Sequence, residues 1–251
     1  TSGLEVHTQT QELMPVVQQL NAMFRRLDAA FARERQFSND VAHELRTPLA
    51  ELRMLTEVGG RWPDDQKAVI QYFADAHAIC EQMEGVVFSL LTLTRCERGV
   101  QPVQRTPLNL LELIETTWLS VERTAAEKSH DFECDVSPEI VVHSDRDILL
   151  MLLRNLLENA VFHSPANSTI CCIATQDGAT LRLTISNPAA DLSSEDMPHL
   201  FERFWRKDVA RSDGSHAGLG LAVVKAFSDL LGLDVQARVG QHQMFAITLS
   251  L

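Results

Sequence analysis

Apolar residues recur at helical spacing through the first hundred residues of the chain. We predict two long helices, over residues 10–58 and 66–98, joined by the turn-forming residues 59–65 as an antiparallel hairpin. At about 100° per residue, one apolar stripe on the first helix contains Phe37, Val41, Leu45, Pro48, Leu52 and Leu55. The second helix carries Phe73, Cys80, Met83, Val87 and Leu90. Two hairpins would bury these stripes as a four-helix bundle, which predicts a homodimer. The alternative is that residues 1–100 pack on the rest of the chain.

The pattern changes near residue 100 to an alternation of strands and helices. We expect one strand within 99–107 and further strands at 131–136, 140–143, 168–175, 179–187, 233–239 and 244–251. Helices are expected at 147–163 and 219–231, the second ending at Gly232. The predicted fold class is therefore α plus α/β: a helical hairpin that forms a dimeric four-helix bundle, followed by an α/β sandwich.

Charge and cysteine content exclude several classes of protein. The 251 residues include 34 acidic and 22 basic side chains, a formal charge of −12, which argues against DNA or an anionic membrane as the main partner. The five cysteines lack the spacing of a zinc site, and we interpret them as reduced thiols in a cytosolic compartment. The opening Thr1-Ser2-Gly3 resembles a cloning scar, so we expect a longer parent protein.

The first helix carries a histidine on the face opposite its apolar stripe. His43 lies away from Val41 on the helical wheel, with Glu44 adjacent and Thr47 one turn along. A lone surface histidine is usually only solvated. An exposed imidazole becomes a nucleophile when a neighbouring base takes its proton, and Glu44 is placed to be that base or to orient the ring.

The sequence from Phe37 to Leu49, FSNDVAHELRTPL, resembles the phosphoacceptor box of bacterial sensor histidine kinases. The resemblance implies that His43 is phosphorylated on a ring nitrogen and that Glu44 assists the transfer. It also implies that Thr47 positions a water that dephosphorylates the partner regulator. Domains would then be a signalling linker helix (1–36), a dimerisation and phosphotransfer domain (37–100) and an ATP-binding domain (101–251).

Two asparagines one helical turn apart stand in the second half of the chain. Asn155 and Asn159 place both amides on one side of a helix, and amide oxygens suit Mg²⁺ beside phosphates. Taken alone, they could be ordinary surface asparagines. The segment NLLENA resembles the asparagine box of the same family, which implies Asn159 as the Mg²⁺ ligand and Asn155 beside it. Phe162 and His163 follow at positions that border the nucleotide in this family.

Three further segments extend the resemblance in the order that the family shows. Phe201 to Arg206 resembles the phenylalanine box, which implies Phe201, Phe204 and Arg206 as nucleotide-site residues; a buried aromatic cluster is compatible with this. Gly218-Leu219-Gly220 resembles the second glycine box, where backbone N–H groups approach phosphates at a helix start. The polar residues 207–217 are interpreted as the lid.

The first glycine box departs from the family pattern. Asn187 stands where the family has the aspartate that binds adenine, and the two following glycines are absent. An asparagine still offers a carbonyl oxygen but loses the charge assistance. Phe162 also stands where the family often has a lysine or arginine.

The resemblance implies ATP- and Mg²⁺-dependent autophosphorylation of His43 and transfer to an aspartate of a response regulator, with regulator phosphatase activity. It places this part of the protein on the cytoplasmic side of the bacterial inner membrane, attached through a segment outside this chain. Two alternatives stay open. One is a phosphatase-biased or scaffold protein with a degenerate nucleotide site, and the other is a plain ATPase or chaperone-like protein.

Overall fold

A computed structural model describes residues 14–61, 66–97, 102–178, 180–189, 191–207, 217–240 and 243–251. The chain divides into two compact units, one ending at Ile79 and the other beginning at Cys80. The boundary falls inside a helix. The domain limits predicted from the sequence stay predictions. No helix within the described ranges combines the length and apolar character needed to cross a membrane.

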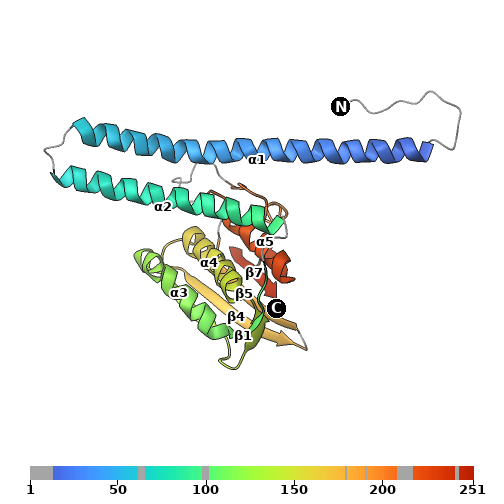
Figure 1. Cartoon of the computed structure of the whole chain (residues 1–251). Coiled ribbons are helices and arrows are strands. Elements are labelled where there is room, and N and C mark those ends of the chain that lie inside the picture. The colour runs from blue at the N-terminus through green and yellow to red at the C-terminus, as the bar shows by residue number, and fades with distance from the viewer. Residues whose placement is uncertain are drawn as a thin grey trace. The chain divides into compact units, whose positions relative to one another are not determined.

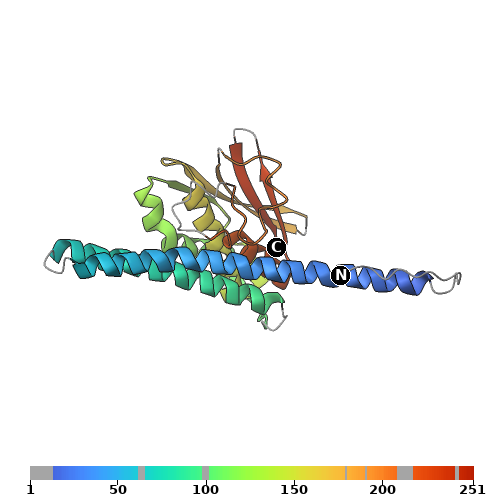
Figure 2. The ribbon, with the colours of Figure 1, turned by 90° about the horizontal axis from the view of Figure 1, so that it is seen from above.

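The first unit contains one long helix and the beginning of a second. Helix α1 (Met14–Arg61) is one continuous helix that contains Pro48, and α2 (Gln66–Glu97) follows it. The part of α2 that belongs to this unit, up to Ile79, runs back beside α1 as the predicted hairpin requires (Figures 1 and 2). The predicted turn at Gly59 and Gly60 is wrong, because α1 continues through both glycines to Arg61. The aspartates expected to cap α2, Asp64 and Asp65, lie outside the described residues.

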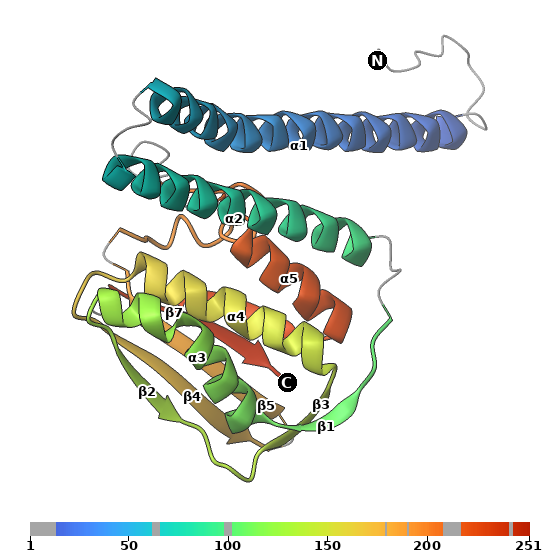
Figure 3. The same cartoon turned by 60° about the vertical axis from the view of Figure 1, so that its left-hand side comes forward.

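The second unit contains a five-stranded sheet with the order β2-β4-β5-β7-β6. Its strands are β2 (Asp131–Asp135), β4 (Thr169–Asp177), β5 (Thr180–Pro188), β6 (Asp234–Val239) and β7 (Met244–Ser250). Strand β2 pairs parallel to β4, and the other pairs are antiparallel. A separate antiparallel pair joins β1 (Thr106–Asn109) to β3 (Val141–Ser144). Helices α3 (Leu110–Glu127), α4 (Arg146–His163) and α5 (Gly220–Leu231) cover one face of the sheet (Figure 3).

Both predicted β-hairpins, β4–β5 and β6–β7, are confirmed. Helix α3, by contrast, was not predicted from the sequence. Asn109 caps α3, since its side chain accepts a hydrogen bond from the Glu112 N–H at 3.0 Å. Apolar residues three and four positions apart bury one face of α3, including Leu110, Leu113 and Val121. Helix α3 is therefore stabilised by a side-chain N-cap and by a buried apolar face.

Helix α4 separates the core from the candidate site. Asp145 caps its start by accepting from the Ile148 N–H, and Leu149, Leu152, Leu153, Leu156 and Leu157 are at most 2% exposed. Burial of each such side chain contributes about 1.5–3 kcal/mol. With one side fixed by this packing, the polar side of α4 is held in a defined orientation. The site described next lies along that side.

Candidate functional site

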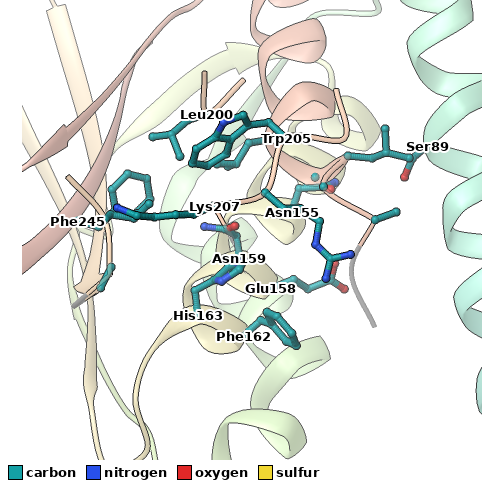
Figure 4. Close-up of a pocket in the computed structure, with 18 of the residues that line it drawn as sticks. Ser89, Asn155, Glu158, Asn159, Phe162, His163, Leu200, Trp205, Lys207 and Phe245 are labelled. Atoms are coloured by element: carbon teal, nitrogen blue, oxygen red, sulfur yellow. The ribbon is translucent and has the colours of Figure 1, made fainter. Parts of the chain in front are cut away.

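A cavity of about 490 Å³ lies in the second unit beside the polar side of α4 (Figure 4). Its walls come from α4, the segment before α5, the start of α5, Phe245 of β7 and the second half of α2. Most of the residues that the sequence singled out line it together: Asn155, Asn159, Phe162, His163, Arg206, Gly218, Leu219 and Gly220. Segments far apart in the chain therefore meet around one cavity.

The α4 wall presents two amides and two rings. The Nδ2 of Asn155 donates to the carbonyl of Met151 at 2.8 Å, which directs its oxygen away from its own helix. Asn159, one turn along, lies among the lining side chains labelled in Figure 4. At the end of α4 the rings of Phe162 and His163 meet edge to face, with their centroids 4.9 Å apart. This wall offers hard amide oxygens and flat apolar surface.

Lys128 contacts the carboxyl end of α4 from outside the cavity. Its Nζ donates to the carbonyl oxygen of Phe162 at 2.6 Å and lies 4.9 Å from the centroid of the Phe162 ring. A cation at the carboxyl end of a helix complements the partial negative charge there. Lys128 thereby fixes the position of Phe162, although Lys128 itself does not line the cavity.

The approach to α5 depends on one glycine. Gly218 has a φ of +66°, and a Cβ there would lie 2.8 Å from the carbonyl oxygen of Trp205. Its own carbonyl accepts a hydrogen bond from the Phe204 N–H at 3.0 Å, and Phe204 has a φ of +60°. The backbone at 204–205 therefore packs directly on Gly218. A side chain at position 218 would push these two segments apart.

Helix α5 begins at the cavity without a side-chain cap, and its first residues, Gly220 and Leu221, are among the lining. The first N–H groups of a helix lack intrahelical partners and carry partial positive charge. This end of the helix suits an anion such as a phosphate. The residues present thus fit a polyphosphate with a divalent cation, the amide oxygens of α4 serving the cation and α5 the anion.

Charged side chains border the cavity as ion pairs. Lys207 lines it and binds the Oδ2 of Asp196, which also accepts bonds from the backbone N–H and the hydroxyl of Ser193. These bonds, with that from Lys207 the largest cause, lower the pKa of Asp196 to about 2. Glu158 also lines the cavity and pairs with Arg154 at 2.7 Å. Asp191 adds a carboxylate to the lining.

Three residues expected at the nucleotide site lie outside the lining. Asn187 is 2% exposed on β5, and its Nδ2 donates to the carbonyl of Pro188 at 3.0 Å. Phe201 and Phe204 are half-buried beside the cavity wall. Residues 208–216 of the expected lid lie outside the described residues.

Sequence reasoning missed several lining residues, namely Asp191, Leu200, Trp205 and Phe245. Leu200 directly precedes the phenylalanine box and Trp205 lies within it, so that motif was the available signal for both. Phe245 reaches the site because β7 pairs with β5 in the register that places Phe245 opposite Asn187. Periodicity along one strand cannot give that register.

The predicted phosphoacceptor residues lie on α1, in the first unit. His43 and Thr47 are exposed and stand one turn apart, while Glu44 is half-buried. Residues four apart share a helix face, so the imidazole and the hydroxyl face the same solvent. Within the described residues, no cluster of three or more histidine, cysteine or acidic side chains is arranged to hold a metal ion.

Comparisons with known proteins match both parts of the chain. Residues 33–99 match the His Kinase A (phospho-acceptor) domain, and residues 144–251 match the histidine kinase-, DNA gyrase B- and HSP90-like ATPase family. Over 228 residues the chain is 32% identical to the sensor protein QseC of Escherichia coli K12, covering 90% of this chain and 49% of QseC. The chain thus spans about half the length of this relative.

Solved histidine kinase structures share the fold. AdeS of Acinetobacter baumannii aligns with a TM-score of 0.67 at 22% identity, over 83% of this chain and 96% of AdeS. ThkA, solved in complex with the response regulator protein TrrA, aligns with a TM-score of 0.68 at 18% identity, over 97% of this chain and 68% of that one. With a phospho-acceptor domain followed by an ATPase domain in one polypeptide, the chain belongs to the bacterial two-component sensor histidine kinases.

Proposed function

We propose that this chain uses ATP and Mg²⁺ to phosphorylate His43 and then passes the phosphoryl group to an aspartate of a response regulator. The observation that carries the proposal is the pairing of two features in one chain: an exposed histidine within the matched phospho-acceptor domain, and a cavity within the matched ATPase domain. This cavity is lined by Asn155, Asn159 and the start of α5.

In the proposed reaction, a ring nitrogen of His43 attacks the γ-phosphorus of ATP, and the bond to the bridging oxygen of ADP breaks. Glu44 takes the ring proton or orients the imidazole. Asn159 would hold Mg²⁺ through its amide oxygen, and the bound ion would neutralise charge on the phosphates. In-line attack requires the acceptor and the nucleotide to come together, so the two units must be free to move.

At position 155 the α4 wall carries an amide rather than a water-activating base, although Glu158 and His163 also line the cavity. Asn155 is an amide, which cannot act as a general base toward water, and its Nδ2 is already bonded to Met151. This favours transfer to a histidine over simple hydrolysis. It also argues against the plain ATPase or chaperone-like alternative.

We propose that the hairpin pairs with a second copy of itself. Phe73 and Val87, two members of the predicted apolar stripe on α2, are 73% and 44% exposed in the single chain. Exposed apolar side chains at helical spacing are best covered by another helix pair, which supports a four-helix bundle. The regulator would then dock near the exposed face of α1, where Thr47 would orient the water that removes its phosphoryl group. We place this part of the protein on the cytoplasmic side of the inner membrane.

The test is phosphorylation of the purified chain with radiolabelled ATP and Mg²⁺, read as acid-labile label on the protein. His43→Gln should abolish the label while nucleotide affinity, measured by calorimetry, stays unchanged, because acceptor and cavity lie in different units. His77→Gln, at another exposed histidine of the hairpin, is the matched control and should label like the parent. Label that persists in His43→Gln would remove His43 from the proposal.

A second candidate is a phosphatase-biased or scaffold protein. Two observations favour it: the Asn187 amide is bonded to Pro188 rather than lining the cavity, and the Asp191 carboxylate adds negative charge to the cavity lining. ATP titration of the parent and of Asn187→Asp separates the two candidates. Absence of ATP binding in both, together with dephosphorylation of a phosphorylated regulator, would establish the second candidate.

A further inference from the structure

Two cysteines face each other across neighbouring strands at the β2 edge of the sheet. Cys134 on β2 and Cys172 on β4 are direct partners in the parallel register. Neighbouring strands lie about 4.7–4.9 Å apart, within the span of about 4.4–6.8 Å that Cα atoms of a disulfide adopt. Both cysteines are free thiols.

Both thiols lie on the side of the sheet that α3 covers. Phe132 and Cys134 are two residues apart on β2 and so share a face. The Phe132 ring stacks on Trp118 of α3, with centroids 4.1 Å apart and planes 8° from parallel. The same register brings Ile170 opposite Phe132, and Ile170 is fully buried. This packing holds Cys134 and Cys172 in one orientation.

The two thiols differ in the properties that a redox pair needs. Cys134 is exposed to solvent, whereas Cys172 is fully buried. A hydrogen bond from the Cys172 thiol is the main reason that the pKa of Cys134 lies below its usual value. The same contact, together with burial, raises the pKa of Cys172. The accessible sulfur is therefore the nucleophile, and the buried one stays a protonated thiol that donates to it.

We infer that Cys134 and Cys172 form a redox-active pair, which a hydroperoxide converts to an intramolecular disulfide between β2 and β4. The inference is independent of the proposed kinase activity. The paired register, the shared face and the contrast in accessibility carry it.

The oxidation of the two thiols to a disulfide takes two steps. The Cys134 thiolate attacks one oxygen of hydrogen peroxide and the O–O bond breaks; the hydroxide released takes up the proton that Cys134 gave up, leaving a sulfenic acid and one water. The Cys172 sulfur then attacks Sγ of Cys134, the S–O bond breaks, and the hydroxide leaves with the Cys172 proton as a second water. Two thiols are oxidised and one peroxide is reduced to two waters.

The neighbouring Cys171 provides a control within the same strand. It points to the opposite face, where its sulfur lies 3.9 Å from the Glu133 carboxylate. Burial is the main cause that raises the pKa of Cys171, and the Glu133 charge adds to it. Cys171 should therefore react slowly, although it adjoins Cys172 in the sequence.

The experiment treats the purified chain with hydrogen peroxide and reads intact mass and a non-reducing peptide map. The chain should lose the mass of two hydrogen atoms, carry a Cys134–Cys172 link, and return to the starting mass with dithiothreitol. Cys134→Ser should abolish the link, and because position 134 is exposed this variant should keep its fold. Cys171→Ser should form the link at the parent rate.

Cys172→Ala should stop the reaction at the sulfenic acid of Cys134, trapped by dimedone. A link through Cys80, Cys96 or Cys171, a link between two chains, or over-oxidation of Cys134 without a link would overturn the inference. If Cys172→Ala fails to fold, the Cys134→Ser and Cys171→Ser pair still decides between these outcomes.

Discussion

A methyl group added at Gly218 should destabilise the second unit through two separate effects. The φ of +66° costs a non-glycine residue about 1–2 kcal/mol. A Cβ would also lie 2.8 Å from the Trp205 carbonyl oxygen and 2.9 Å from the carbonyl carbon of Phe204. Both neighbours are backbone, so relief requires the chain at 204–205 to move, at a typical overpacking cost of roughly 1–3 kcal/mol.

Gly218→Ala should therefore lower the free energy of unfolding by about 2–5 kcal/mol, less about 0.4–1 kcal/mol from the stiffer unfolded chain. For a domain of this size class, the melting temperature should fall by roughly 2–18 °C. The assay is thermal unfolding of the purified chain without nucleotide, followed by circular dichroism. A nucleotide titration of the same variant should show weaker binding, because residues 205–207 border the cavity.

Gly220→Ala is the matched control two residues away. A Cβ there meets only the Asn155 Oδ1, at an ordinary 3.5 Å, and Gly220 is absent from the positive-φ positions. Since Gly220 begins α5, alanine should leave stability unchanged or raise it by up to about 1 kcal/mol. Equal melting of Gly218→Ala and the parent, or an equal loss in both variants, would refute the steric reasoning.

Three further predictions concern the site and its borders. Asn159→Ala should remove the Mg²⁺ dependence of ATP binding in calorimetry without unfolding the chain, because the core face of α4 is untouched; unchanged affinity with Mg²⁺ would contradict the role of Asn159. Thr47→Ala should keep autophosphorylation but slow dephosphorylation of the regulator in a phosphate-release assay, and a parent rate would exclude Thr47. Because the pKa of Asp196 is lowered from 3.8 to about 2, its bond to Lys207 should stabilise the fold fully above about pH 4 and fade as the pH falls through 2. Asp196→Asn should thus have a lower free energy of unfolding than the parent at pH 7, measured by urea unfolding. The difference between the two proteins should narrow toward pH 2, and a difference independent of pH would exclude a stabilising role for the Asp196 charge.

Local signals predicted most elements because they act between near neighbours in the chain. The hairpin around Gly178 is confirmed, with that glycine at a φ of +62°, and α5 ends at Gly232 in the left-handed region. Helix α3 was missed although Asn109 supplied a cap signal. Its Thr116-Thr117-Trp118 run has low helix propensity, but the Thr117 hydroxyl bonds the Leu113 carbonyl at 2.6 Å and tertiary burial decides the outcome.

The candidate site was predicted as far as it rests on compact motifs. Asn155 and Asn159 lie one turn apart on a single helix, so their common side follows from periodicity alone. The contribution of Phe245 depends on strand pairing between distant segments, and that of Asp191 on the path of a loop. Neither the sheet register nor the loop path is encoded by a local period. For the same reason, the burial of Asn187 outside the cavity lining could not be foreseen.

The sheet order has a consequence for how the second unit forms during synthesis. Strand β7 is the last described strand, yet it lies between β5 and β6 in the sheet, with Ile247 paired to Ile185. Until β7 has left the ribosome, β5 and β6 have no hydrogen-bonding partner in common, and the sheet consists of two separate parts. Pairing β7 with β5 closes a loop that contains all the residues between these two strands, and closing a long loop is entropically costly and slows folding. Nascent chains that stall before β7 should therefore expose the inner edges of β5 and β6, making them candidates for chaperone capture rather than partly active intermediates.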